Sequence, residues 1–430
     1  MRWGETPERH GGAVVDQLLH RPPGKRDLRH GETLVRGSRG SNRTGSPWRN
    51  QRHCCLYDQA TVMWPTTVER GTVSQASFAC RCCGSQAVET VLDLGRQPSW
   101  DHMPPADAPL PDPLHPLRMG FCRDCHLAQL IEDVDGIEEI PAVESVAMLN
   151  QAERTLARVS ELGLLAPGVT VAEFPSPHSA PWMPQLVRQG LVEQPDGPAR
   201  LVIDVYGLLH EPDQDAALRR RIDVLAPDGT LVLQFRSLAT TLRERQWTDL
   251  RHGHQAYWSL PALDRVLRRF GLGVHRAWWY PFDAGTVVAA ATRNPEPDPE
   301  TQDLLRKEVA TGVIDPERLR DLQRAASSAD RLREWLERER AEGRRVAGYG
   351  AASRAVPLIY RAGLDASLLA AIGDASPARH GRRMPGTDIP IISPDELVAM
   401  RPDRVVVFIP DLIAEVRAAL PSIEDNRGRW

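Results

Sequence analysis

The run Leu201-Val202-Ile203-Asp204-Val205-Tyr206 is apolar except for one acid, which is the pattern of a short strand buried on both faces. Similar runs occupy residues 169–174 and 230–235, and helical patterns at about 184–189 and 214–224 separate the three runs. Strands that alternate with helices pair in parallel through right-handed crossovers. The segment therefore predicts an open, doubly wound α/β sheet whose ligand lies beyond the carboxyl ends of its strands.

The domain built on this sheet is expected to span residues 150–294. A helical pattern at 151–164 precedes the first strand, and a helix capped by Ser259 follows the third. Two extended runs, 272–278 and 286–292, then follow. Their spacing suits an antiparallel pair of strands at the edge of the sheet.

A second, smaller α/β domain is predicted at residues 343–424. Linker helices precede it at 300–342, and their charged stretch 316–342 has the pattern of one long helix. The first strand of the domain, 345–349, leads directly into Gly350 and then into a helix. Such a junction directs backbone N–H groups and the positive end of a helix at one point, which suits a phosphate.

Two further features of this domain suit a nucleotide ligand. Asp374 follows the next strand, where an acid can accept hydrogen bonds from ribose hydroxyls. Arg383 belongs to a basic loop, residues 379–383, whose arginines can pair with a diphosphate. An ordinary tight turn beside a solvated basic loop is the alternative interpretation. Binding of a nicotinamide cofactor at the strand–glycine–helix junction is a third.

Two Cys-x2-Cys pairs mark another unit, at residues 78–135. They are Cys80 with Cys83, and Cys122 with Cys125. Four thiolates at this spacing can close one tetrahedron about a zinc ion, and with no open ligand position the ion would be structural. Two disulfides are the alternative, but they need an oxidising compartment, and no secretion-like segment is recognised. The sequence therefore predicts a four-cysteine zinc module without Cys82, Cys54 or Cys55.

Length and charge exclude some classes of protein. The chain has 430 residues, 41% of them hydrophobic, and a formal charge of -4, which predicts several domains and no general affinity for nucleic acid or for a membrane surface. No apolar run approaches the roughly 20 residues of a membrane helix. A cytoplasmic protein is expected, of an oligomeric state that these residues do not reveal.

The first 62 residues differ from the rest because arginines are scattered among Gly, Ser and Pro without apolar periodicity. Such a segment cannot bury enough surface to offset its ordering entropy. We interpret residues 1–62 as a disordered extension, or as the result of a start placed too far upstream of Met63. A basic arm that contacts phosphates is the alternative.

Several separated stretches carry a resemblance to a known family. They are residues 80–84, 92–98 and 116–125 around the cysteines, and residues 349–351 and 384–391 in the last domain. The chain resembles the S-adenosylmethionine-dependent nucleotide-sugar C-methyltransferases over most of its length after Ser77. The resemblance implies a zinc-binding module, a Rossmann-like methyltransferase domain, shortened here, and a second Rossmann-like domain at the C-terminus.

The resemblance also implies a function and its ligands. The expected reaction is C-methylation of a nucleotide-linked keto-sugar, in the synthesis of secondary metabolites or surface sugars, with structural zinc and S-adenosylmethionine as cofactors. In the last domain it implies that Tyr349 and Gly350 contact the substrate, and that Arg354, which stands where lysine is usual, supplies positive charge for the diphosphate. The only partner expected is the nucleotide-sugar itself.

For the cofactor, the resemblance implicates Glu173 at the end of the first strand and His210 in the loop after Tyr206. The corresponding loop, residues 173–179, contains two prolines and no glycine, whereas close approach of a cofactor to backbone needs glycine. The stretch from Glu173 to Asp204 is also expected to be too short for a second strand, its helix and a third strand. Glu193 is the remaining candidate acid for the ribose, and its neighbours have the pattern of a turn.

Residues 249–258 correspond to the catalytic stretch of the family, and the resemblance implicates His254, His252 and Tyr257. Arg251 replaces a tyrosine and Gly253 a glutamate. His254 aligns with the histidine taken as general base, and a neutral imidazole can remove a proton from a carbon beside a ketone.

Histidines that line an inactive cleft, and an adventitious metal pair, are the alternatives for His252 and His254. Two hypotheses therefore follow from the sequence. One is a C-methyltransferase with an altered cofactor loop, and the other is a non-catalytic relative that binds a sugar nucleotide or a partner enzyme.

Overall fold

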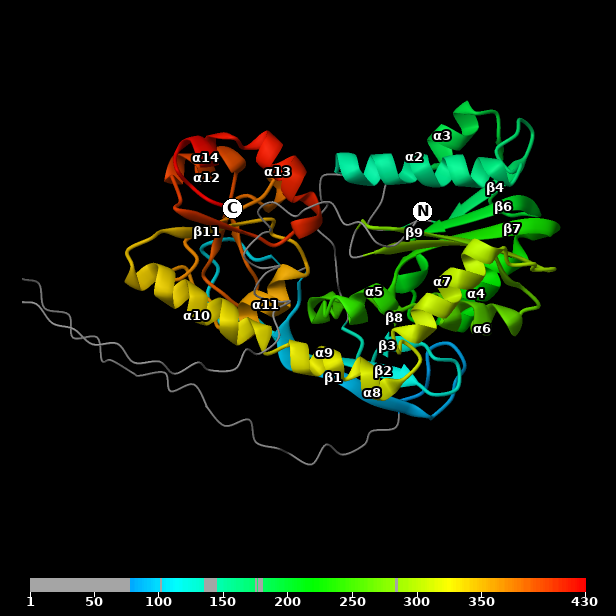
Figure 1. Cartoon of the computed structure of the whole chain (residues 1–430), viewed down its shortest axis with the longest axis horizontal. Coiled ribbons are helices and arrows are strands. Elements are labelled where there is room, and N and C mark those ends of the chain that lie inside the picture. Colours follow the sequence, from blue (N-terminus) through cyan, green and yellow to red (C-terminus); the bar gives the residue numbers. More distant parts are fainter. Residues whose placement is uncertain (1–77, 101–102, 135–144, 175, 177–180, 283–284) are drawn as a thin grey trace, which may run out of the picture. The chain divides into compact units, whose positions relative to one another are not determined.

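The computed structural model describes residues 78–100, 103–134, 145–174, 176, 181–282 and 285–430. Three β-sheets organise these residues (Figure 1), and one compact unit contains all of them. The predictions for residues 1–62 lie outside the described residues. No helix in the described part of the chain is long and apolar enough to cross a membrane.

The predicted doubly wound sheet is confirmed as a six-stranded sheet of order β5-β4-β6-β7-β10-β9. Strands β5, β4, β6 and β7 are parallel, and β10 runs antiparallel to both of its neighbours. The strands are β4 (Thr170–Phe174), β5 (Val192–Glu193), β6 (Ala199–Val205), β7 (Leu225–Arg236), β9 (Gly273–Tyr280) and β10 (Thr286–Thr292).

Alternation along β6 explains why both faces of this sheet are covered. Leu201 and Ile203 face a core shared with α2 and α3, whereas Val202 faces a core shared with α4 and α6. In Figure 1 these two pairs of helices lie on opposite sides of the sheet. The helices of this domain and the linker are α2 (Val146–Glu161), α3 (Met183–Arg188), α4 (Gln214–Asp223), α5 (Leu238–Arg243), α6 (Leu260–Arg268) and α7 (Pro299–Ala310), with short 3₁₀ turns η1 (Leu208–His210) and η2 (Trp247–Asp249).

The expected shortening between Glu173 and Asp204 is confirmed, because no helix and no further strand separate β5 from β6 among the described residues. Between β4 and β6 the chain still forms a helix, α3, and a second strand, β5, which is only two residues long and pairs in parallel with β4. Glu193 lies exposed in this strand, and the expected turn follows it, closed by a hydrogen bond from the N–H of Gly197 to the carbonyl of Gln194 at 3.2 Å. A third strand is absent from the described residues here, so the sheet is shortened on that side.

The four-cysteine module forms a sheet of order β1-β2-β3-β8. Its first three strands are β1 (Val88–Pro98), β2 (Leu114–Cys122) and β3 (Ala128–Leu130), whereas β8 (Ala256–Tyr257) comes from the segment between η2 and α6. Ala128 pairs with Tyr257 and Gln129 with Ala256. The module therefore holds the chain directly after His254 by backbone hydrogen bonds.

The last domain has a five-stranded sheet of order β13-β14-β12-β11-β15, parallel except for β13. A second α/β sheet in the last third of the chain confirms the predicted fold class. Its strands and helices are β11 (Val346–Tyr349), α11 (Ala355–Arg361), β12 (Ile372–Gly373), η3 (Pro377–Arg379), β13 (Arg382–Arg383), β14 (Pro390–Ile392), α12 (Pro394–Met400), β15 (Arg404–Val407), η4 (Pro410–Leu412), α13 (Ile413–Ala419) and α14 (Ser422–Asp425).

The prediction of one long helix over 316–342 is wrong, because this stretch forms α8 (Pro316–Leu319), α9 (Asp321–Ala325) and α10 (Ser328–Ala341). The charged periodicity continues, but the packing partners change along it. Helices α8 and α9 contact β1, whereas α10 contacts α11 and β11. Because the helix breaks at residue 320 and near residue 327, the buried side chains of all three helices pack into the same hydrophobic core.

Candidate functional site

The four cysteine sulfurs converge on one point. Cys80 Sγ lies 3.5 Å from Cys125 Sγ, Cys83 Sγ lies 3.5 Å from Cys122 Sγ, and all four atoms lie within 4.8 Å of one another. Zinc–sulfur bonds of about 2.3 Å at the corners of a tetrahedron place sulfurs about 3.8 Å apart. The donor set therefore fits a structural zinc ion. The alternative of two disulfides is excluded because these cysteines are not bonded in pairs.

The two knuckles share one backbone geometry. The N–H of Gly84 donates to the carbonyl of Cys80, and the N–H of His126 donates to that of Cys122, at 2.9 Å in both cases. Gly84 and His126 each have a positive φ, 72° and 65°. The tight turn that aims both sulfurs inward thus needs the left-handed conformation, which glycine adopts without strain.

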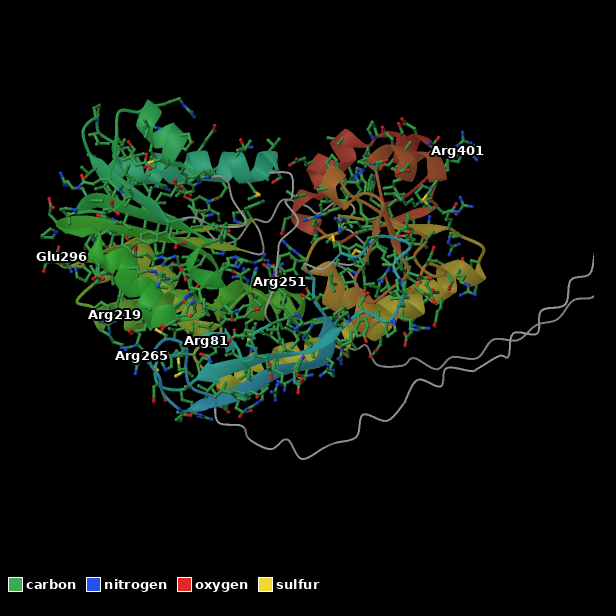
Figure 2. The ribbon with its side chains drawn as sticks, turned by 180° about the vertical axis from the view of Figure 1, so that it is seen from behind. Arg81, Arg219, Arg251, Arg265, Glu296 and Arg401 are labelled. Atoms are coloured by element: carbon green, nitrogen blue, oxygen red, sulfur yellow. The ribbon has the colours of Figure 1, made fainter. Side chains whose placement is uncertain are left out.

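The zinc module is tied to the loop that carries His210. Arg81 (Figure 2), inside the first knuckle, donates to the carbonyl oxygens of Leu130 and Pro212 at 2.9 and 3.2 Å. Its own carbonyl accepts from the backbone of Gln214, whose side-chain amide donates to the carbonyl of Leu208 at 2.8 Å. The zinc module therefore holds the loop that carries His210 in place, as well as β8.

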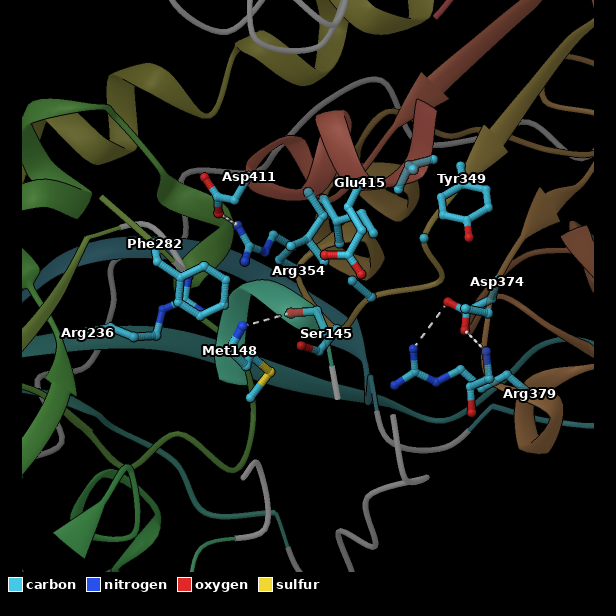
Figure 3. Close-up of a pocket in the computed structure, with 18 of the residues that line it drawn as sticks. Ser145, Met148, Arg236, Phe282, Tyr349, Arg354, Asp374, Arg379, Asp411 and Glu415 are labelled. Carbon is cyan, nitrogen blue, oxygen red and sulfur yellow. Dashed lines mark hydrogen bonds and ion pairs between the residues drawn. The ribbon is translucent and has the colours of Figure 1, made fainter. Parts of the chain in front are cut away.

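A cavity of about 350 Å³ lies among the ends of β6, β7 and β11 and helix α13, within the size range of small-molecule sites. Its lining includes four arginines and three carboxylates, and Figure 3 shows most of these side chains directed at one another. The arginines are Arg236, Arg251, Arg354 and Arg379, and the acids are Asp374, Asp411 and Glu415.

The strand–glycine–helix junction forms one wall of this cavity. Gly350 has a φ of +90°, and a Cβ there would lie 2.8 Å from the Ile409 side chain, so only glycine fits. The carboxylate of Asp374 accepts from the backbone N–H groups of Ala351 and Ser376 at 2.8 Å each, and from Arg379 at 3.2 Å. Asp374 therefore holds the turn itself and has acceptor capacity left over, since a carboxylate has about four acceptor positions.

Four of the five residues predicted for substrate binding line the cavity: Tyr349, Gly350, Arg354 and Asp374. Burial, with the nearby carboxylates of Asp374 and Glu415, raises the pKa of Tyr349 above its ordinary value. Its phenol therefore stays protonated at neutral pH. Arg354 contacts Asp411 at 3.4 Å and is half-buried, so its guanidinium borders the cavity.

Arg383 lies elsewhere, and its predicted role in substrate binding is corrected. Its guanidinium forms a bidentate pair with Asp112 at 2.7 Å and donates to the carbonyl of Thr387 at 3.0 Å. The residue is 1% exposed and is not among the described residues that line the cavity. Arg383 thus links the last domain to the loop after β1, and the neighbouring Arg379 takes the place in the cavity.

The structure separates the three residues predicted for catalysis. His254 lines the cavity and accepts a hydrogen bond at Nδ1 from Arg251 Nε at 3.3 Å. The ring of His252 turns away, with Nε2 3.0 Å from the carbonyl oxygen of Pro116, so its predicted catalytic role is corrected to a structural one. This also removes the alternative of a His252–His254 metal pair.

Tyr257 is likewise not among the described residues that line the cavity. Its hydroxyl accepts from the backbone N–H of Arg251 at 3.1 Å and lies 3.3 Å from the carbonyl of the same residue. Burial raises its pKa well above the ordinary value of tyrosine. The neutral phenol therefore supports the loop that presents Arg251 and His254, and it does not contact a ligand in this cavity.

Glu173 has a different task from the one predicted. Its two carboxylate oxygens accept from the backbone N–H groups of Trp182 and Met183 at 2.6 and 2.7 Å, at the start of α3. Burial raises the pKa of Glu173, in spite of these donors. The carboxylate expected to hold the cofactor thus closes the N-terminus of α3. Residues 175 and 177–180 of the loop after β4 lie outside the described residues.

His210 lies beside His254 and not beside Glu173. The two imidazole rings meet edge to face, with centroids 4.9 Å apart, and His210 Nδ1 lies 3.1 Å from the carbonyl of Gly253. His210 is half-buried at the end of η1. The structure therefore groups the two histidines as one pair.

Other lining residues carry no signal in the sequence, because distant elements bring them together. Ser145 and Met148 belong to the start of α2, Phe282 follows β9, and Glu415 belongs to α13. Arg236 is the exception. It ends β7, and the rule that ligands lie at the carboxyl ends of parallel strands would have selected it.

Comparisons with known proteins identify two regions of the chain. Residues 80–138 match the family described as "Putative zinc binding domain", and residues 282–430 match that described as "C-methyltransferase C-terminal domain". The C-methyltransferase NovU of Streptomyces niveus is 27% identical over 238 residues. This match covers 54% of the chain and 57% of the relative, so the chain spans little more than half the length of that protein.

Solved structures similar to the chain include a magnesium protoporphyrin IX methyltransferase from Synechocystis PCC 6803 with bound SAH, at 10% identity and a TM-score of 0.28, covering 36% of this chain and 90% of that one. A complex of DhpI with SAH matches at 15% identity and a TM-score of 0.24, covering 36% and 88%. The chain therefore contains a region that matches a zinc-binding domain and a region that matches a C-methyltransferase C-terminal domain, and part of it is similar to C-methyltransferase NovU.

Proposed function

We propose that the chain is a C-methyltransferase that uses S-adenosylmethionine and acts on a nucleotide-linked keto-sugar, in the synthesis of secondary metabolites or surface sugars. The observation that carries the proposal is the cavity that places His254 among four arginines. Arginines suit a diphosphate because their planar donor groups match its oxygens. A histidine beside the same cavity suits proton chemistry at a carbon next to a ketone.

The residues of the last domain account for the nucleotide part. The N–H groups after Gly350, and the guanidinium groups of Arg354 and Arg379, border one wall of the cavity. Asp374 fixes both the turn and Arg379, which keeps the positive charge in place before a ligand arrives. Sugar attached to the diphosphate would then extend toward His254.

Bound S-adenosylmethionine would supply the methyl group. The loop after β4 has no glycine, however, and Glu173 is used by α3. These two observations favour a second candidate, a non-catalytic relative that binds a sugar nucleotide or a partner enzyme through the same cavity. The two candidates agree on the sugar nucleotide and differ on the cofactor.

Calorimetric titration of the zinc-bound protein separates them. S-adenosylmethionine and S-adenosylhomocysteine are titrated first, then thymidine, uridine and guanosine diphosphates. Binding of one diphosphate and of the cofactor supports the methyltransferase, whereas binding of a diphosphate alone supports the non-catalytic relative. The variant Arg354→Ala should weaken the diphosphate, and Arg338→Ala, at an exposed position on α10, is the matched control. No binding of any diphosphate would refute both candidates.

A further inference from the structure

His254, which lines the cavity, and His210, whose ring contacts that of His254, differ in the partner of their Nδ1 atoms. Neutral imidazole carries one proton, on Nδ1 or on Nε2, and the nitrogen without it accepts a hydrogen bond. The partner of one nitrogen therefore decides what the other can do. His254 and His210 are both positioned by side chains and backbone groups that the structure describes.

Arg251 decides the state of His254. Its Nε–H donates to His254 Nδ1 at 3.3 Å, and the residue is 5% exposed. A guanidinium is always protonated in proteins and has no acceptor. Nδ1 must therefore carry the lone pair, and the proton of the neutral ring resides on Nε2. Protonation of Nδ1 would set an N–H of His254 against the N–H of a permanent cation.

Arg251 is itself fixed from two sides. Its terminal nitrogen Nη1 donates to Ser353 Oγ, on the junction after β11, at 2.5 Å. Its backbone N–H donates to the hydroxyl of Tyr257, in β8, at 3.1 Å. The arginine thus joins the His254 segment to the diphosphate wall of the cavity, in a position where the sequence pattern of the family has tyrosine.

We propose that Arg251 fixes His254 as the Nε2–H tautomer, so that His254 meets the substrate as a hydrogen-bond donor and not as the general base. Arg251 is then a positioning residue that acts through His254. The tautomer stands on the geometry alone, whereas its meaning for catalysis rests on the proposed function.

His210 has the opposite arrangement. The carbonyl of Gly253 lies 3.1 Å from His210 Nδ1, and since a carbonyl only accepts, this nitrogen carries the proton. The basic nitrogen of neutral His210 is therefore Nε2. Of the two neutral rings, whose centroids lie 4.9 Å apart, His254 thus carries its proton on Nε2 and His210 on Nδ1.

In the proposed reaction His254, which lines the cavity, takes the part of a donor. Its Nε2–H would donate to the ketone oxygen of the bound sugar and so polarise the carbonyl.

The test reads the tautomers directly, on the full-length, zinc-bound protein without ligand. Long-range ¹H–¹⁵N correlation spectra of protein labelled in its histidines distinguish protonated from unprotonated ring nitrogens. The chain has 13 histidines, so the variants His254→Gln and His210→Gln assign the two rings by the signals they remove. We expect His254 as Nε2–H and His210 as Nδ1–H at neutral pH.

Two variants then examine the cause. Arg251→Met keeps the stem of the side chain but removes the donor, and should convert His254 to a mixture of tautomers. Ser353→Ala removes the other partner of Arg251 and should leave the Nε2–H tautomer of His254 in place. A wild-type His254 that is protonated on Nδ1 would overturn the proposal, as would an Arg251→Met variant whose His254 signals do not change. Neither result depends on turnover or on cofactor binding, so failure of the proposed function would be seen separately.

Discussion

Replacing the buried acid Glu308 by glutamine should make the protein more stable at neutral pH. Glu308, on α7, accepts from Ser237 Oγ and from the backbone N–H of Leu260, both at 2.6 Å, and so joins the starts of α5 and α6. Burial raises its pKa from 4.5 to about 7, since two neutral donors do not offset the loss of hydration.

The sign of the effect follows from the two pKa values. Below pH 4.5 the carboxyl is protonated in both the folded and the unfolded chain and costs nothing. Between 4.5 and about 7 the unfolded chain loses the proton and the folded chain keeps it, so stability falls as the pH rises. With about 1.4 kcal/mol for each pH unit, the loss reaches about 3 kcal/mol above pH 7.

Denaturant unfolding of wild type and Glu308→Gln, measured across this pH range, gives the difference in the free energy of unfolding. The variant should gain about 3 kcal/mol on wild type between the acid and the neutral end of the range, because its amide does not titrate. Loss of zinc at low pH affects both proteins and cancels in the difference. Glu334→Gln, at an exposed position on α10, should show no such trend. A constant difference between wild type and Glu308→Gln at every pH would show that titration of Glu308 does not change the stability of the fold.

Two further predictions concern buried charge and the metal. Asp204→Asn should destabilise the fold by about 3 kcal/mol, because it leaves the buried guanidinium of Arg221 without the carboxylate that now lies 2.6 Å away. In the same denaturation assay Asp228→Asn, which breaks an exposed ion pair, should cost less than about 1 kcal/mol. Cys122→Ser should bind less than one zinc ion per chain and melt at a lower temperature, whereas Cys82→Ser should keep the ion. Elemental analysis measures the zinc content of both variants, and equal contents would contradict the assigned ligands.

The local sequence was sufficient where the structure depends on short-range patterns. The alternation of apolar runs and helices predicted the parallel core of the sheet, because side-chain periodicity reports which faces are buried. Spacing alone identified the zinc ligands, since a Cys-x2-Cys turn aims its own two sulfurs. The glycine after β11 could be placed at a ligand wall for the same reason: its conformation is set within a few residues.

Long-range partners decided the rest. The charged stretch 316–342 has the periodicity of one helix, yet its buried side chains contact β1 first and α11 later, so the helix breaks. Arg383 and Arg379 belong to the same basic loop, and nothing in that loop shows that Asp112 pairs with the first while Asp374 pairs with the second.

The candidate site divides in the same way. Local sequence patterns were enough to identify the zinc ligands, the alternating α/β sheets and the histidines of the expected catalytic stretch. Which of these histidines lines a cavity depends on distant residues. The carbonyl of Pro116 lies at the ring of His252, whereas Ser353 accepts from Arg251, the neighbour that donates to His254. A side chain's chemistry depends on its partners, and partners far apart in the chain are brought together only when the whole domain packs.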